Sequence, residues 1–424
     1  MRYTFTTYNL GCKVNAYELS AISSLLIAKG YEEDANNPDV VIINTCSVTA
    51  TADQKSRQHI RKMQKLFPNA VIAVMGCYSQ GNYEFIKDEI KPTILLGTSH
   101  RKDVVNLIEK ALKEKEAYCL IDENTRNFEY EELGITSYSE NVRAFLKIQD
   151  GCNNFCTYCI VPYRRGKMRS RSKENVLKEA EYLVKQGYQE IVLSGIHVGG
   201  YGQDLKDCSF SSLVEELTNI RGLKSLRISS IEESEIDDKL IELIKDKDNL
   251  AKHLHIPLQA GSNHVLKMMN RKYTREQFIE KIKRIKTAMP DVMISGDVIV
   301  GFPQESEEDF LDTYKLCEEC FDMLHVFPYS MRPGTAAARM DGQISPDVKK
   351  QRSKVLLELS DKLYIKFANK FIGQNITVLV EKYDEQKGVN IGHTSNYISV
   401  EIPLKESKVG QFITVKLQKD MIAS

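Results

Sequence analysis

Three cysteines in one short segment carry the most distinctive chemistry of this chain. Cys152, Cys156 and Cys159 are separated by three and two residues. Thiolates at this spacing can hold three irons of a cubane iron–sulfur cluster and leave the fourth iron without a protein ligand. S-adenosylmethionine (SAM), bound to that iron through its amino and carboxylate groups, turns such a cluster into a radical generator. The alternatives are a zinc site or three ordinary cysteines; zinc sites usually add a second ligand pair, and the neighbouring sequence offers none.

A second set of three cysteines is dispersed over the first 80 residues. Four apolar runs predict strands, each followed by a helical pattern or a turn: residues 3–8, 40–43, 70–75 and 93–96. Strands that alternate with helices predict a doubly wound parallel sheet, which binds ligands beyond the carboxyl ends of its strands. Cys12, Cys46 and Cys77 each follow a strand at that edge. We therefore expect a second three-cysteine cluster with one open iron; the alternative is that these are ordinary buried cysteines.

The middle of the chain repeats a strand–helix unit six times. The strands are predicted over residues 142–148, 190–194, 225–231, 253–258, 292–301 and 322–329. Six units are too few for a closed eight-stranded barrel, so the pattern predicts an open, partial (βα)6 barrel. The segment with Cys152 follows the first strand, which places the cluster at the active edge of this barrel.

Several loops at the same edge carry groups suited to hold SAM. Residues 193–200 are rich in glycine and can offer backbone groups to the amino acid end of a ligand. Residues 257–262 can hydrogen-bond a ribose, and residues 297–303 can give an adenine an apolar wall. The candidate SAM-binding residues are Tyr158, Ser194, Gly195, Ser230, Gln259, Ser262 and Val300. For each polar residue taken alone, an ordinary loop hydrogen bond is the alternative. His197, His253 and His255 have no partner at ligand spacing, and we do not expect them to bind a metal.

Two further regions carry positive charge that RNA phosphates would attract. Residues 163–171 contain five cations beside the cluster segment, and they predict either a solvated loop or a phosphate contact that includes Arg165 and Arg169. From residue 371 onward, short alternating strands over 376–381, 389–392, 397–402 and 412–417 predict a small antiparallel β-barrel. Such a barrel can bind single-stranded nucleic acid or serve as a packing module.

Length and composition limit the remaining possibilities. The chain has 424 residues, with 58 basic and 58 acidic side chains, so any nucleic-acid surface must be local. We expect an N-terminal domain over 1–120, a linker over 121–140, a barrel over 141–370 and a tail domain over 371–424. Ten cysteines in a chain of this length suggest metal ligation in a reducing compartment. No apolar run suits a signal peptide or a membrane span, so we expect a soluble cytoplasmic protein.

The motifs together resemble one family, the radical-SAM methylthiotransferases. Residues 10–15, 44–46 and 75–77 match its three auxiliary-cluster positions, 151–159 match its radical-SAM motif, and 392–397 resemble its TRAM signature. The resemblance implies two [4Fe-4S] clusters, SAM, and a tRNA substrate bound at the anticodon loop. It also implies that a 5′-deoxyadenosyl radical attacks C2 of an adenine, and that the cluster of Cys12, Cys46 and Cys77 carries the sulfur. An electron donor such as flavodoxin or ferredoxin is expected, and the sulfur source is left open.

Within this family, residues 13–15 and 52–57 resemble the branch that acts on N6-threonylcarbamoyladenosine at position 37 of tRNA. A basic residue suits the carboxylate of this nucleoside, so Lys13, Asn15 and Arg57 join the predicted substrate-binding residues. The alternatives are a branch acting on isopentenyladenosine-37, a branch acting on a ribosomal protein, and a non-catalytic Fe–S protein that binds RNA. Ser295, Gly296 and Gln304 depart from the usual family pattern, which weakens predictions for individual residues in that loop.

Overall fold

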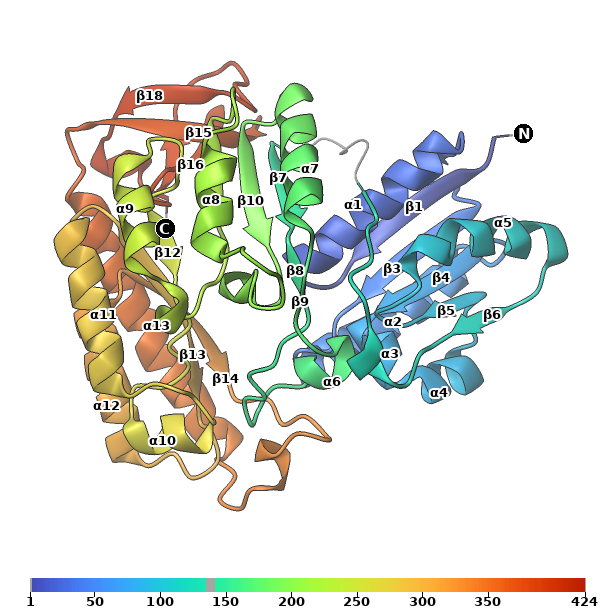
Figure 1. The fold of residues 1–424 in the computed structure, drawn as a ribbon, viewed down its shortest axis with the longest axis horizontal. Helices are drawn as coiled ribbons and strands as arrows, with labels where there is room; N and C mark the ends of the chain where they lie inside the picture. The colour runs from blue at the N-terminus through green and yellow to red at the C-terminus, as the bar shows by residue number, and fades with distance from the viewer. Residues whose placement is uncertain (1, 135–141, 424) are drawn as a thin grey trace.

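The first part of the chain forms a parallel sheet with helices on both faces (Figure 1). The structure, a computed structural model, describes residues 2–134 and 142–423. The strand order is β2-β1-β3-β4-β5-β6, and every pair is parallel. The elements are β1 (Thr4–Asn9), α1 (Lys13–Ala28), β2 (Glu32–Glu33), β3 (Val40–Thr45), α2 (Ala50–Leu66), β4 (Val71–Gly76), α3 (Cys77–Gly81), α4 (Tyr83–Phe85), β5 (Ile94–Leu96), α5 (Val104–Glu114) and β6 (Tyr118–Leu120). Strands β3 and β4 are buried throughout because helices cover both faces, α1 and α5 on one and α2 on the other.

The middle of the chain forms the predicted open barrel. Its elements are β7 (Arg143–Lys147), β8 (Gln149–Asp150), α6 (Val161–Arg165), β9 (Arg169–Ser170), α7 (Lys173–Lys185), β10 (Glu190–Ser194), α8 (Phe210–Thr218), β11 (Ser225–Ile228), α9 (Asp238–Asp246), β12 (His253–His255), α10 (Asn263–Met268), α11 (Arg275–Ala288), β13 (Met293–Val300), α12 (Glu307–Cys320), β14 (Met323–Pro328) and α13 (Pro346–Asn369). Strands β11-β10-β7 form one parallel sheet and strands β12-β13-β14 form another. Isolated β-bridges between the β11 and β12 segments join the two sheets. Strands β7 and β14 are the open edges. The third and fourth strands are shorter than predicted, but the fold class is confirmed.

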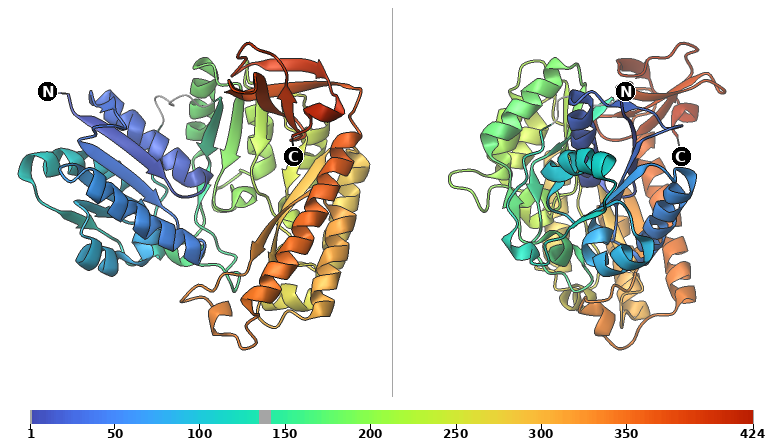
Figure 2. Two further views of the ribbon diagram at one scale, coloured as in Figure 1. Left: turned by 180° about the vertical axis from the view of Figure 1, so that it is seen from behind. Right: turned by 90° about the vertical axis from the view of Figure 1, so that its right-hand side faces the viewer.

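The tail forms an antiparallel sheet that packs on the barrel. Its strands, β15 (Asn375–Asp384), β16 (Val389–Thr394), β17 (Ser399–Ile402) and β18 (Phe412–Lys416), follow the order β17-β16-β15-β18. Their core includes Met293 of β13 and Phe367 of α13, so the tail covers the amino ends of the barrel strands (Figures 1 and 2). The ring of Tyr397 stacks on His253 at 4.6 Å, at the start of β12, so the tail contacts the barrel at the edge opposite the cluster loop.

The segment predicted to be a linker is packed between the two α/β units where the structure describes it. Residues 135–140 of that segment lie outside the described residues. In the part before them, the Tyr130 hydroxyl donates to the carbonyl of Lys147 at 2.9 Å, and Glu132 pairs with Arg171 at 2.8 Å. None of the helices described in the structure is long and apolar enough to cross a membrane.

Candidate cluster sites and active-site cavities

The three N-terminal cysteines converge because their strands are neighbours in the sheet. Cys12 precedes α1, Cys46 follows β3, and Cys77 opens α3 directly after β4. Gly76 has a φ of 106°, and a Cβ there would lie 2.4 Å from the Asn44 side chain, so a side chain at this position would push the Cys77 turn out of place. Burial, together with the nearby Cys77 and Cys12, raises the pKa of Cys46 to about 11. Three crowded thiols cannot all ionise unless a cation compensates them, which fits iron ligation.

Asn15 holds these turns together, which differs from the substrate contact predicted for it. It is buried, and its amide nitrogen donates to Asn44 Oδ1 at 2.7 Å and to the Thr45 carbonyl at 3.1 Å. Its side-chain oxygen accepts from Arg165 at 3.0 Å and lies 3.3 Å from the sulfur of Cys12. Because these protein partners use its polar atoms, Asn15 positions the cysteines and does not face a substrate.

The second triplet lies on a loop that neighbouring segments fix in place. Gly151 has a φ of 70°, and a Cβ there would lie 1.9 Å from the Lys167 carbonyl, so the loop needs glycine to begin. Thr157 donates from its backbone to Met269 at 3.1 Å and from its hydroxyl to Met268 at 2.8 Å. Burial, and then the nearby thiols of Cys156 and Cys152, raise the pKa of Cys159 to about 12. All ten cysteines of the chain are free. This donor set also fits three irons of a cluster.

The predicted basic loop beside the second triplet is largely buried, so the phosphate contact expected of Arg165 and Arg169 is wrong. Arg165 is 1% exposed and donates to Glu18 at 2.9 Å, to Asp150 at 3.2 Å and to the sulfur of Cys77 at 3.3 Å. Arg169 pairs with Asp150 at 3.2 Å. The physical reason is that two buried carboxylates from different parts of the chain need these cations. The arginines therefore join the N-terminal sheet to the barrel.

Each triplet has a guanidinium group at one of its sulfurs. Arg165 lies beside Cys77, and Nη1 of Arg271 lies 3.6 Å from the sulfur of Cys156. No sequence pattern indicated Arg271, because it lies more than 100 residues after the cysteine that it contacts. Near the same triplet, His197 lies 2.6 Å from Glu235. Burial opposes its protonation, but hydrogen bonds with Cys152 and Glu235 raise the pKa of His197 to about 10. These cations can offset the negative charge of a thiolate-bound cluster.

The predicted SAM-binding residues do not all line the same cavity. Tyr158 and Gln259 line a pocket of about 240 Å³, which Cys159 from the barrel and Val48 and Thr49 from the N-terminal domain also border. Ser194, Gly195 and Ser230 line a larger cavity of about 450 Å³ inside the barrel, the lumen cavity.

Two of the predicted SAM-binding residues lie in neither place. Ser262 is buried, caps α10 and donates its hydroxyl to Asp309. Val300 is fully buried in the barrel core, and its neighbour Ile299 lines the smaller pocket instead. Successive side chains of a strand point to opposite faces, so the predicted apolar wall is offset by one residue. The predictions for Ser262 and Val300 are therefore corrected.

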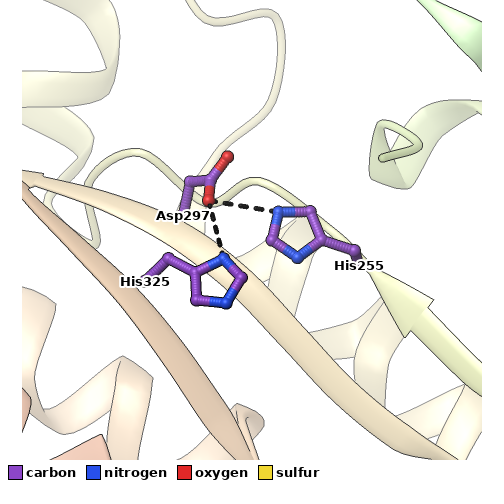
Figure 3. Close-up of side chains that lie close together, drawn as sticks. All are labelled: His255, Asp297 and His325. Atoms are coloured by element: carbon purple, nitrogen blue, oxygen red, sulfur yellow. Dashed lines mark ion pairs between the residues drawn. The ribbon is translucent and has the colours of Figure 1, made fainter. Parts of the chain in front are cut away.

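A His–Asp–His group at the barrel interior was not predicted (Figure 3). Oδ1 of Asp297 lies 3.2 Å from Nε2 of His255 and 3.4 Å from Nδ1 of His325. The facing ligand atoms of the three residues lie within 4.8 Å of one another, close enough for a metal ion. The hydroxyl of Ser295 lies 3.0 Å from His255 and 2.7 Å from His253, so it fixes both rings. The three residues come from β12, β13 and β14, which explains why no local spacing revealed them.

Two predicted substrate residues of the N-terminal domain are separated in space. Lys13 lines the lumen cavity together with Cys12, whereas Arg57 lies on α2 beside Tyr78. Burial, and next the charges of Arg143 and Arg227, lower the pKa of Lys13. Lys13 is exposed and lines the lumen cavity from the N-terminal domain, a position that no sequence pattern indicated.

An open six-stranded parallel barrel with a three-cysteine loop after its first strand defines a radical-SAM protein. The Radical SAM superfamily model matches residues 146–317, the uncharacterized protein family UPF0004 matches 3–97, and the TRAM domain matches 369–421. Among solved structures, the radical S-adenosylmethionine methyltransferase TsrM from Kitasatospora setae has a TM-score of 0.58 at 13% identity, covering 80% of this chain and 77% of TsrM. At this identity the likeness concerns the fold alone.

Full-length relatives place the chain more narrowly. The threonylcarbamoyladenosine tRNA methylthiotransferase MtaB of Bacillus subtilis is 44% identical over 98% of this chain and 94% of its own length. The tRNA-2-methylthio-N(6)-dimethylallyladenosine synthase of Thermoanaerobacter pseudethanolicus is 38% identical over 98% of this chain and 90% of its own length. The chain therefore belongs to the radical-SAM methylthiotransferase family. It is an enzyme of this class, with a [4Fe-4S] cluster and SAM implied by its family.

Proposed function

We propose that this enzyme converts N6-threonylcarbamoyladenosine at position 37 of tRNA to its 2-methylthio derivative, with SAM and two [4Fe-4S] clusters. The observation that carries the proposal is that both cysteine triplets border neighbouring cavities of the barrel. Cys12 borders the lumen cavity, and Cys159 borders the pocket beside it. The name of the Bacillus subtilis relative, which is 44% identical, supports this substrate.

The chemistry requires two separate centres because C2 of adenine bears an unactivated C–H bond. When bound, the clusters and SAM supply a carbon-centred radical at one centre and a methylated sulfur at the other. Cys152, Cys156 and Cys159 would hold the radical cluster, and Cys12, Cys46 and Cys77 the auxiliary one. The protein's own contribution is to hold both triplets rigidly around a substrate cavity and to exclude water from it. An anticodon loop suits this arrangement because its bases can be splayed out without opening a duplex.

Nucleoside analysis tests the substrate. Protein with reconstituted clusters, SAM, a sulfide source and a reductant such as reduced flavodoxin or ferredoxin is given tRNA carrying threonylcarbamoyladenosine or isopentenyladenosine. We expect 2-methylthio product on the first tRNA and little on the second. A preference for the isopentenyl tRNA, as the name of the 38% identical relative would indicate, contradicts the proposed substrate but leaves the enzyme class intact.

Iron and sulfide analysis tests the number of clusters independently. Anaerobically purified protein should contain about eight irons and eight sulfides per chain, because each cubane holds four of each. Half of this amount, or zinc in place of iron, contradicts the assignment of the N-terminal triplet.

A further inference from the structure

The lumen cavity has one positive charge that no side chain neutralises. Arg143 and Arg227 share one carboxylate, Glu190, at 2.9 and 3.1 Å. Arg143 also pairs with Glu381 of the tail. Lys13 enters the same cavity, and among residues 2–134 and 142–423 no carboxylate lies within ion-pairing distance of its ammonium group. Lys13 is itself exposed, and a cation without a carboxylate partner beside two arginines in a cavity favours an anionic ligand.

The floor of the cavity comes from the tail domain. Tyr397 is stacked between His253 at 4.6 Å and His393 at 4.7 Å. The guanidinium groups of Arg227 and Arg143 lie 5.0 and 5.9 Å from its ring. These contacts hold the two arginines at the amino ends of the barrel strands, so the cationic end of the cavity is rigid. The volume, about 450 Å³, lies within the range of about 300–1,000 Å³ typical of small-ligand sites.

The two ends of the cavity differ in chemistry. Cys12 borders the cavity from the N-terminal domain, Arg143 begins β7 at the floor, and Asp297 and His325 lie midway along β13 and β14. An adenine placed by the N-terminal triplet would therefore direct a substituent into the barrel. The imidazoles and the carboxylate offer both donors and acceptors to hydroxyl and amide groups along the way.

We infer that the lumen cavity binds the carboxylate of the substituent on the modified adenine, and that Lys13 is its ion-pair partner. The inference rests on the proposed function and assigns the part of the site that selects the substrate. A threonylcarbamoyl group supplies the missing anion and a hydroxyl, whereas an isopentenyl group would leave the ammonium of Lys13 unpaired beside hydrocarbon. The enzyme would thus distinguish the two substrates because only the threonylcarbamoyl group carries a carboxylate that can pair with Lys13.

The test compares two anticodon stem-loop RNAs on the holoenzyme. One carries threonylcarbamoyladenosine, and in the other the threonine carboxylate is replaced by a neutral primary amide of nearly the same size. Because a hydrogen bond to a charged group contributes substantially more than a neutral one, we expect the amide RNA to bind wild-type protein roughly 10- to 100-fold more weakly. Lys13→Met should bind the acid RNA about as weakly as the amide RNA, and Lys13→Arg should keep most of the preference.

A matched control and a second readout exclude trivial explanations. Lys29→Met removes the same charge just beyond the opposite end of α1, outside the cavity, and should bind both RNAs as the wild type does. The affinity for SAM, which also carries a carboxylate, should be unchanged in Lys13→Met. The iron content of each variant shows whether a change beside Cys12 has altered cluster assembly. The comparison of the two RNAs on the wild type does not depend on any variant and so is free of this effect.

Three results would overturn the inference. They are equal affinity of the wild type for both RNAs, a preference that survives in Lys13→Met, and a loss that falls on SAM and not on RNA. Failure of the proposed function has a different signature, since the wild type would then methylthiolate the isopentenyl stem-loop and not the threonylcarbamoyl one.

Discussion

Glu18 holds the two cluster-bearing halves of the enzyme together, and its charge can be removed with little change in shape. It is fully buried, and one carboxylate oxygen accepts from Arg165 at 2.9 Å and Lys147 at 3.1 Å. The same oxygen forms an ion pair with Arg101 at 3.1 Å. Glu18→Gln leaves these three cations with Asp150 as their remaining buried anion. Removing one partner of a buried ion pair typically costs about 3–5 kcal/mol. We expect a loss of this size in the free energy that closes the interface between the N-terminal sheet and the barrel.

Hydrogen exchange measures this local free energy without unfolding the whole chain. Amide protection in α1 and in residues 147–171 should fall by roughly two to four orders of magnitude, since about 1.4 kcal/mol is a factor of ten. The control is Glu109→Gln, which removes a half-buried surface partner of Lys29 at 3.3 Å and should cost less than about 1 kcal/mol. Equal protection in Glu18→Gln and the control would refute the argument that this network fastens the interface.

The same carboxylate gives the interface a pH dependence of known sign. Burial raises the pKa of Glu18, but the neighbouring Arg101, Arg165 and Lys147 outweigh it and hold the pKa well below its usual range. A depressed carboxyl pKa stabilises the folded state above the unfolded value of about 4.3, and this stabilisation is lost as the pH falls below it. The difference in protection between the wild type and Glu18→Gln should therefore be full at pH 7 and shrink below about pH 4.

Three further predictions concern the clusters and the RNA surface. Cys156→Ala should abolish formation of 5′-deoxyadenosine and leave the iron of the other cluster in place; release at near wild-type rates would show that this triplet is not the radical site. Cys46→Ala should lose the iron of one cluster and all methylthiolated product but still cleave SAM, and normal product would mean that the N-terminal cysteines are core residues. Replacing Lys382, Lys387 and Lys405 with Gln should weaken tRNA binding and lower the salt slope by about one for each phosphate that is no longer neutralised, whereas an unchanged slope at two or more salt concentrations would exclude RNA binding there.

The positions of the six cysteines in the two triplets could be predicted because backbone pattern alone determines them. A cysteine that follows a buried parallel strand must lie at the carboxyl edge, and Cys12, Cys46 and Cys77 follow adjacent strands. The short edge strand β6 was not predicted. It lies in the apolar run 117–121, but it has only three residues, and Cys119 and Leu120 are exposed.

The environment of charged residues could not be predicted in the same way. The sequence around Arg165 does not distinguish it from an exposed arginine. It is buried because it pairs with Glu18, 147 positions away, and with Asp150, 15 positions away. His325 and Asp297 lacked any local spacing for the same reason, since adjacent strands bring them together across a helix. The direction of side chains along a strand was also mispredicted: Val300 was expected to line the SAM pocket, but its neighbour Ile299 does so.

The position of Tyr397 changes what loss of the tail would do to the reaction. Because its ring forms the floor of the lumen cavity, a chain that ends before the tail would open that cavity to bulk solvent at the amino ends of the barrel strands. Water could then reach a substituent held in this cavity from the tail side of the barrel. The tail therefore closes the lumen cavity, a role separate from the RNA binding predicted for its lysines.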